Sequence, residues 1–126
     1  MAMQVELVSP ERILFSGEAS SVTARSAGGD IAFLTGHAPF IGLLGTGAVT
    51  IALTDGTTMK VAVHGGFVEV MDDRVTILSD VAELATEIDR ARAERALAAA
   101  QGSTGGGDAD ADDAARRARL RLDLAS

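Results

Sequence analysis

The chain has 126 residues, of which 47% are hydrophobic, and a formal net charge of -7. A chain of this length buries roughly two-thirds of the surface that its unfolded form exposes, which suffices for one compact domain or for a small domain with an appendage. It contains no cysteine, so disulfides are excluded. The acidic balance disfavours nucleic-acid binding, which usually needs a basic face. We expect neither a signal peptide nor a membrane span, which needs ~18 consecutive apolar residues.

Residues 1–80 are predicted to form an N-terminal antiparallel β-sandwich, or flattened barrel. Short apolar runs rich in β-branched residues fill this region, and several alternate with polar residues as half-buried strands do. The sequence "TDGT" predicts a tight hairpin with Asp55 and Gly56 at its tip, and "MDDR" joins two later strands. The expected core residues are Val5, Leu7, Ile13, Phe15, Val22, Ile31, Phe33, Val49, Ile51, Val61, Val63, Phe67, Val70, Val75 and Ile77.

Residues 81–126 follow a different pattern, which predicts a C-terminal α-helical hairpin. The expected elements are a helix over about residues 86–101, a Gly-rich linker over 102–107 and a helix over about 109–123. Thr86 is the expected N-cap of the first helix, with Asp89 three residues later. Because the apolar faces are mostly alanine, their burial contributes little, at ~25 cal/mol per Å² of apolar area. We therefore expect a weakly held, movable appendage.

The sequence offers no self-sufficient active site. His37 and His64 lie far apart in the chain, without cysteine companions, and no zinc-protease, nucleophile-elbow or phosphate-loop motif is present. We interpret "HGGF", which begins at His64, as a tight turn between strands, where glycine supplies unusual backbone angles. His37 is interpreted as a residue that orders its loop by bonding to backbone. No catalytic residue and no metal site are predicted.

Five sequence stretches, in order along the chain, resemble one known family. They are "VSPERILFSGEA", "GHAPF", "VHGGFVEV", "RVTILSDVAE" and "EIDRARA". Together they are similar to the epsilon subunit of bacterial F-type ATP synthase, over essentially the whole chain. The resemblance implies a β-sandwich followed by a helical hairpin, in agreement with the two patterns above.

The resemblance also implies a function without an active site. Such a subunit lies on the central stalk, binds the gamma subunit and the ring of c subunits, and turns with the rotor, so that proton flow is coupled to ATP synthesis. It contacts the alpha and beta subunits transiently and restrains ATP hydrolysis. It lies at the cytoplasmic face of the bacterial cell membrane as a peripheral protein, attached only through the complex. The alternative is a free-standing β-sandwich adaptor for protein binding, unrelated to ATP synthesis.

The resemblance assigns a c-ring contact to the segment from "GGDI" through "GHAPF". Asp30 matches an acidic position there, although it can equally be read as an ordinary turn aspartate after two glycines. Glycine and proline would shape a stiff loop, which a torque-bearing contact needs more than reactivity. The expected contact residues are Asp30, Gly36, His37, Ala38 and Pro39.

Some members of this family bind ATP through an I/L-D-x-x-R-A sequence on the first helix. A carboxylate there can accept from the adenine amino group, and guanidinium groups suit phosphate. No cofactor is required, but the resemblance suggests a regulatory ATP. The candidate ATP-binding residues are Glu83, Ile88, Asp89, Arg92, Ala93, Arg116 and Arg119. The alternative is an acidic helix start followed by solvated arginines.

The basic second helix carries one more hypothesis. In the family, the hairpin either folds against the sandwich or extends along gamma toward the catalytic subunits, and the extended form inhibits hydrolysis. Arginines on this helix would then meet an acidic surface of the beta subunits. The candidates for this inhibitory contact are Arg116, Arg117, Arg119 and Arg121.

Overall fold

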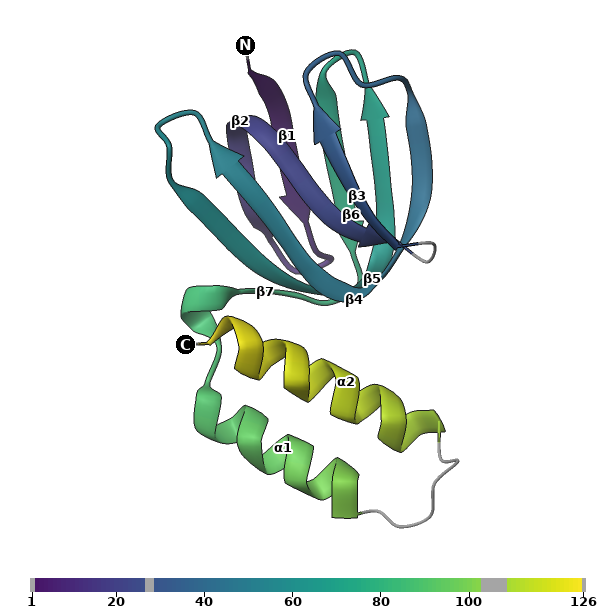
Figure 1. Cartoon of the computed structure of the whole chain (residues 1–126), viewed down its shortest axis with the longest axis vertical. Coiled ribbons are helices and arrows are strands. Elements are labelled where there is room, and N and C mark those ends of the chain that lie inside the picture. The colour runs from purple at the N-terminus through teal and green to yellow at the C-terminus, as the bar shows by residue number, and fades with distance from the viewer. Residues whose placement is uncertain (1, 27–28, 103–108, 126) are drawn as a thin grey trace.

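A computed structural model describes residues 2–26, 29–102 and 109–125 and shows a β-sandwich above a pair of helices (Figure 1). The strands are β1 (Met3–Val8), β2 (Ile13–Ser26), β3 (Gly29–Leu34), β4 (Phe40–Leu53), β5 (Thr58–Met71), β6 (Arg74–Ser79) and β7 (Ala82–Leu84). A short 3-10 turn, η1 (Ala85–Glu87), leads to α1 (Arg90–Gly102) and α2 (Ala109–Leu124).

The strands form one sheet that closes on itself. Hydrogen bonding runs in the order β1-β6-β5-β4-β2, and β2 pairs again with β1. β3 extends the sheet from β2, and β7 pairs with β5. The predicted β-sandwich, or flattened barrel, followed by two helices is therefore confirmed. Most neighbouring strands pair antiparallel, and β1 and β6 run parallel.

Both predicted turns are present. In the hairpin between β4 and β5, Gly56 has a φ of 92, and the Asp55 carboxylate accepts hydrogen bonds from the Thr57 amide and hydroxyl at 2.8 and 2.6 Å. These bonds lower the pKa of Asp55 below its ordinary value. Between β5 and β6, Asp72 and Asp73 have φ values of 51 and 58, the left-handed pair that a tight two-residue hairpin turn requires.

For two residues the prediction of a core position is wrong, because their strands bend. Phe67 and Ile13 are exposed, and their neighbours Val68 and Leu14 are buried instead. In β5 the buried face changes between Val63 and Val68, across the two glycines of "HGGF". In β2 a bulge does the same, since Leu7 pairs with Phe15 and Val8 with Ile13. The buried core is Met3, Val5, Leu7, Leu14, Ala19, Val22, Ala24, Phe33, Leu44, Val49, Ile51, Val61, Val63, Val68, Val70, Val75 and Ile77.

The stretch "HGGF" lies inside β5 rather than in a turn between strands, so that interpretation is also wrong. Gly65 and Gly66 have φ values of 89 and 128, which bend the strand without ending it. The first half of β5 then pairs with β7, and the second half pairs with β6. The Ser79 hydroxyl lies 3.1 Å from the Gly65 carbonyl and 2.8 Å from the Val81 carbonyl, which ties the bend to the segment entering β7.

The second helix lies between the first helix and the sandwich (Figure 1). α2 packs against α1 on one side and against β4 and β5 on the other, and its Ala115 and Ala118 are buried. In α1, Ala93 is buried. Short alanine side chains bury little apolar area, so this layer is held less firmly than the sandwich core.

The first helix begins later than predicted. α1 starts at Arg90, and Asp89 caps it by accepting the Arg92 amide at 3.1 Å, so Thr86 is not the N-cap. The delay has a local cause: Glu87 accepts the Leu84 amide at 3.3 Å and forms an ion pair with Arg12.

The remaining boundaries of the C-terminal half also differ slightly. β7 belongs to the sheet, which therefore continues past the predicted boundary at residue 80. Gly102, expected in the linker, ends α1, and the second helix runs to Leu124 rather than about residue 123. The rest of the expected linker, residues 103–107, lies outside the described residues.

Candidate functional site

An apolar row crosses the outer face of the sandwich. Leu43 pairs with Phe67, Phe67 with Leu78, Leu78 with Val8, and Val8 with Ile13, so the five side chains are successive cross-strand neighbours. Leu43, Phe67, Leu78 and Ile13 are 59%, 53%, 54% and 66% exposed. Single exposed apolar residues are ordinary on a protein surface, but a contiguous set marks a contact surface.

The residues expected to contact the c ring do not form one cluster. Asp30 lies near the start of β3 and forms an exposed ion pair with Arg25 at 3.1 Å, whereas Gly36 follows the end of that strand. At about 3.3 Å per residue, six residues of extended chain separate them by roughly 20 Å. Asp30 and the loop that begins at Gly36 therefore lie apart, although they are close in the sequence.

Three contacts hold the loop from Gly36 to Pro39 in place. Gly36 has a φ of 86, and its amide donates to the Asp73 carboxylate at 2.7 Å. His37 donates from Nδ1 to the Ala38 carbonyl at 2.6 Å, which orders the loop. The His37 ring also packs edge-on to Phe33, with centroids 5.1 Å apart. Ala38 and Pro39 are exposed, and the loop lies at the end of the sandwich away from the helices (Figure 1).

Five of the candidate ATP-binding residues line one cavity at the junction of β7, η1, α1 and α2. Its volume is 270 Å³, slightly below the usual range of about 300–1,000 Å³ for a ligand pocket. Three carboxylates and two guanidinium groups lie around it. The lining residues are Glu83, Glu87, Ile88, Asp89, Arg92, Ala93, Ala96 and Arg121.

Two of the predicted ATP-binding arginines do not line this cavity. Arg116 and Arg119 are exposed on α2, and Arg116 pairs with Asp113 at 2.6 Å. A helix turns by about 100° per residue, so neither position shares a face with Arg121. Sequence reasoning missed Arg121 as a cavity residue, together with Glu87 and Ala96. The signal available for Arg121 was its position three residues after Ala118, which places the two residues on one face of the helix.

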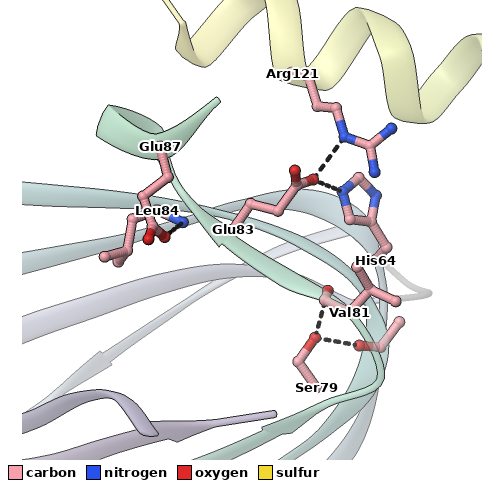
Figure 2. Close-up of polar contacts among 8 residues, drawn as sticks. His64, Ser79, Val81, Glu83, Leu84, Glu87 and Arg121 are labelled. Carbon is pink, nitrogen blue, oxygen red and sulfur yellow. Dashed lines mark hydrogen bonds and ion pairs between the residues drawn. The ribbon is translucent and has the colours of Figure 1, made fainter. Parts of the chain in front are cut away.

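An ionic cluster joins α2 to the sheet beside this cavity (Figure 2). Oε1 of Glu83, on β7, lies 2.6 Å from Nε of Arg121 and 3.1 Å from Nε2 of His64, on β5. Burial opposes ionisation of Glu83, but the hydrogen bond and charge of Arg121, with His64, lower its pKa overall. Burial also opposes ionisation of His64, and this lowers the pKa of the ring. The hydrogen bond to Glu83 acts in the opposite direction but does not cancel the effect. We refer to these three residues as the latch.

The arginines expected to meet the beta subunits face different directions. Arg116 and Arg119 are exposed, Arg117 is half-buried, and Arg121 is half-buried against Glu83. With the hairpin folded, Arg121 is therefore turned toward the sandwich. An inhibitory contact that used all four arginines would require α2 to leave this position.

Residues 2–26, 29–102 and 109–125 contain no cluster of three or more side chains able to hold a metal ion. Within the same residues, no helix is long and apolar enough to cross a membrane. A closed sheet with an apolar outer row and a helical hairpin held by an ionic cluster is the architecture of a protein-binding module with a helical appendage.

Comparison with known proteins assigns this module to a family. Residues 2–85 match the family model of the ATP synthase delta/epsilon chain β-sandwich domain. The ATP synthase epsilon chain of Streptomyces griseus is 49% identical over 121 residues, which are 95% of this chain and 92% of the relative. The chain therefore belongs to the ATP synthase epsilon chain family. It is a subunit of the ATP synthase complex and does not itself catalyse the reaction.

Solved structures show the same fold at lower sequence identity. A chain in the cryo-EM structure of the Euglena gracilis mitochondrial ATP synthase, with OSCP, F1 and c-ring in rotational state 1, superposes with a TM-score of 0.77 at 21% identity, covering 96% of this chain and 75% of that chain. A chain in the central stalk and c-ring structure of the Tetrahymena thermophila mitochondrial enzyme gives 0.65 at 16% identity, covering 100% and 98%.

Proposed function

We propose that this chain is a rotor subunit of the central stalk, which couples proton flow to ATP synthesis at the cytoplasmic face of the bacterial membrane. The observation that carries the proposal is the apolar row on a closed, well-packed sandwich, since a torque-bearing part must be stiff and must grip a partner. The structural neighbours come from assemblies that contain a central stalk or a c-ring, which supports the same placement.

The gamma subunit is the proposed partner of the apolar row, and the c ring is the proposed partner of the stiff loop at residues 36–39. The loop lies at the end of the sandwich away from the hairpin, so a c-ring contact there does not compete with the docked helices (Figure 1). Asp30 is a weaker candidate, because its charge is already paired with Arg25 and it lies at the other end of β3.

Replacing Phe67 with aspartate should weaken binding to gamma. Phe67 is the middle member of the row, flanked by Leu43 and Leu78, and a charge there would have to be desolvated within an apolar contact. A central aromatic in such an interface contributes at least about 2 kcal/mol, or roughly 30-fold in the dissociation constant. Titration calorimetry with purified gamma measures the change.

The matched control for this experiment is Leu34→Asp. Leu34 is 58% exposed, much like Phe67, but it lies on the edge strand β3, away from the row. Leu34→Asp should bind gamma with unchanged affinity. Equal weakening by both variants would mean that the row is not the gamma contact.

A regulatory nucleotide is the proposed ligand of the cavity. Asp89 and Arg92 open α1 at one wall, and Arg121 lies at another. With 270 Å³ available, the cavity fits the adenosine end of ATP, while the guanidinium groups face the phosphates. Three carboxylates beside two guanidinium groups oppose a polyanion, so we expect weak binding, in the millimolar range of affinity, about 4 kcal/mol.

Nuclear magnetic resonance of the full chain during titration with magnesium and ATP tests this ligand. Amides between Glu83 and Ala96 should shift, and Arg92→Ala should abolish the shifts. Arg90→Ala is the control, because Arg90 is exposed, pairs with Glu94 at 3.1 Å and does not line the cavity. No change in these amides at several millimolar ATP would remove nucleotide binding from the account.

We further propose that the hairpin restrains ATP hydrolysis when α2 leaves the sandwich. Two features support this proposal. Among the described residues of α2, the buried ones are alanines, which hold the helix weakly, and a single ionic cluster joins the helix to the sheet through Arg121. A free-standing adaptor would share the sandwich but would have no reason to carry a hairpin that alters ATP hydrolysis. Copurification with gamma separates the two readings.

A further inference from the structure

The carboxylate of Glu83 is shared between the sheet and α2. It accepts from Arg121 at 2.6 Å and from His64 at 3.1 Å through the same oxygen, Oε1 (Figure 2). The His64 side chain is 4% exposed, whereas Glu83 and Arg121 are each about one-third exposed or less, at 31% and 26%. The partly exposed ion pair between Glu83 and Arg121 is thus in direct contact with the buried, titratable ring of His64.

The hydrogen bonds define where the proton lies on His64. Glu83 is ionised, because its pKa is lowered, and an ionised carboxylate can only accept. Nε2 of His64 must therefore carry the hydrogen in the neutral ring. The other nitrogen, Nδ1, is buried and has no hydrogen-bond partner among the described residues. Protonation of His64 would add a hydrogen at this buried position, without an acceptor.

Charge around the ring opposes protonation as well. From α2, both Arg121 and Arg117 face His64 and disfavour the imidazolium form. Glu83 is the ionisable residue of β7, and β4, which also contacts α2, has no ionisable side chain. With α2 docked, one carboxylate would thus have to balance one imidazolium and two guanidinium groups.

We propose that His64, Glu83 and Arg121 form a proton-sensitive latch, which holds α2 on the sandwich while His64 is neutral and releases it when His64 is protonated. Departure of α2 removes Arg117 and Arg121 from the ring and opens the buried Nδ1 edge to water. Glu83 then pairs with the imidazolium alone. The latch concerns this chain by itself and does not depend on the partners or the ligand proposed above.

The direction of the pH effect follows from proton linkage. The docked state has the lower His64 pKa and so binds fewer protons than the undocked state. Docking is therefore at full strength above the ordinary histidine pKa of about 6.5 and weakens as the pH falls below it. One proton is involved, so the docking equilibrium constant should fall by at most about tenfold per pH unit in this range.

Distance measurements between paired nitroxide labels on the full chain test the latch. The chain has no cysteine of its own, so Thr54→Cys at the exposed β4–β5 turn and Asp123→Cys on α2 place one label on each body. Between pH 8 and pH 5, the docked distance should lose population to longer distances. His64→Gln, which cannot titrate, should remove this dependence.

The chain offers a matched control in its other histidine, His37, which belongs to the loop between β3 and β4; that loop lies at the end of the sandwich away from the helices (Figure 1). His37→Gln should keep the full pH dependence of the wild type. A wild-type distance that does not change with pH would overturn the latch, and so would an unchanged dependence in His64→Gln.

A second measurement avoids any change in the buried core. The ring protons of His64 report its pKa by nuclear magnetic resonance in the wild type and in Arg121→Gln, a change on the half-buried outer side of the cluster. The wild-type pKa should lie below 6.5 and should rise when Arg121 is neutralised. Equal values in the two proteins would also contradict the latch.

Discussion

Gly66→Ala is expected to lower the free energy of unfolding by about 3 kcal/mol or more. Gly66 has a φ of 128, in a region that side-chain-bearing residues rarely adopt. A Cβ atom at this position would lie 2.1 Å from the Leu78 carbonyl oxygen and 2.8 Å from the Ser79 Cα atom. Both are backbone atoms of the paired strand β6, so neither can swing aside. Urea denaturation of the purified chain, followed by circular dichroism, measures the loss.

Gly45→Ala is the matched control for this substitution. Gly45 lies in β4, the strand paired with β5 at the same bend, and a Cβ atom there meets nothing within 4 Å. Its effect should stay below about 1 kcal/mol. If both variants unfold at the urea concentration of the wild type, the bend is not what holds β5 in place.

Deletion of residues 102–126 is expected to raise ATP hydrolysis by the membrane-bound enzyme while leaving the complex assembled. The sandwich keeps its closed sheet and its apolar row, because both lie before residue 85. The deletion removes α2 and with it every candidate for the inhibitory contact. A coupling typical of regulation predicts an increase of roughly fivefold or more.

Hydrolysis assays on membranes that contain either form of the chain give the comparison. Replacing Arg116 and Arg119 by glutamine is the matched variant, since both are exposed on the docked helix and neither belongs to the latch. This double substitution should reproduce part of the increase without removing the helix. Equal hydrolysis with the full and shortened chains would exclude a restraining role for the hairpin.

Local chemistry explains which features of the fold could be predicted from sequence. The turns at Asp55–Gly56 and Asp72–Asp73 depend on residues that tolerate positive φ, and both were found. The faces of Ile13 and Phe67 were predicted wrongly, because alternation was extended through a bulge and through a glycine bend. Such a bend exchanges the two faces of a strand, and only the pairing with neighbouring strands shows where it occurs.

The candidate sites also differ in how far the sequence predicts them. The cavity residues from Glu83 to Ala93 are close in sequence, and the structure brings them together. Arg121 joins them only because α2 folds back onto the sheet, a contact that depends on packing over 38 positions. The apolar row is assembled from five strands, so it follows from register and not from any one motif. His64 was interpreted as part of a turn, because burial of a histidine has no local signal.

Isolation of ATP synthase from cells whose epsilon chain has been replaced by this one tests the central claim most directly. The account predicts that the chain copurifies with gamma and the c ring at one copy per gamma subunit and restores proton-driven ATP synthesis. Recovery of gamma and the c ring without the chain, while the folded chain stays in the unbound fraction, would contradict it.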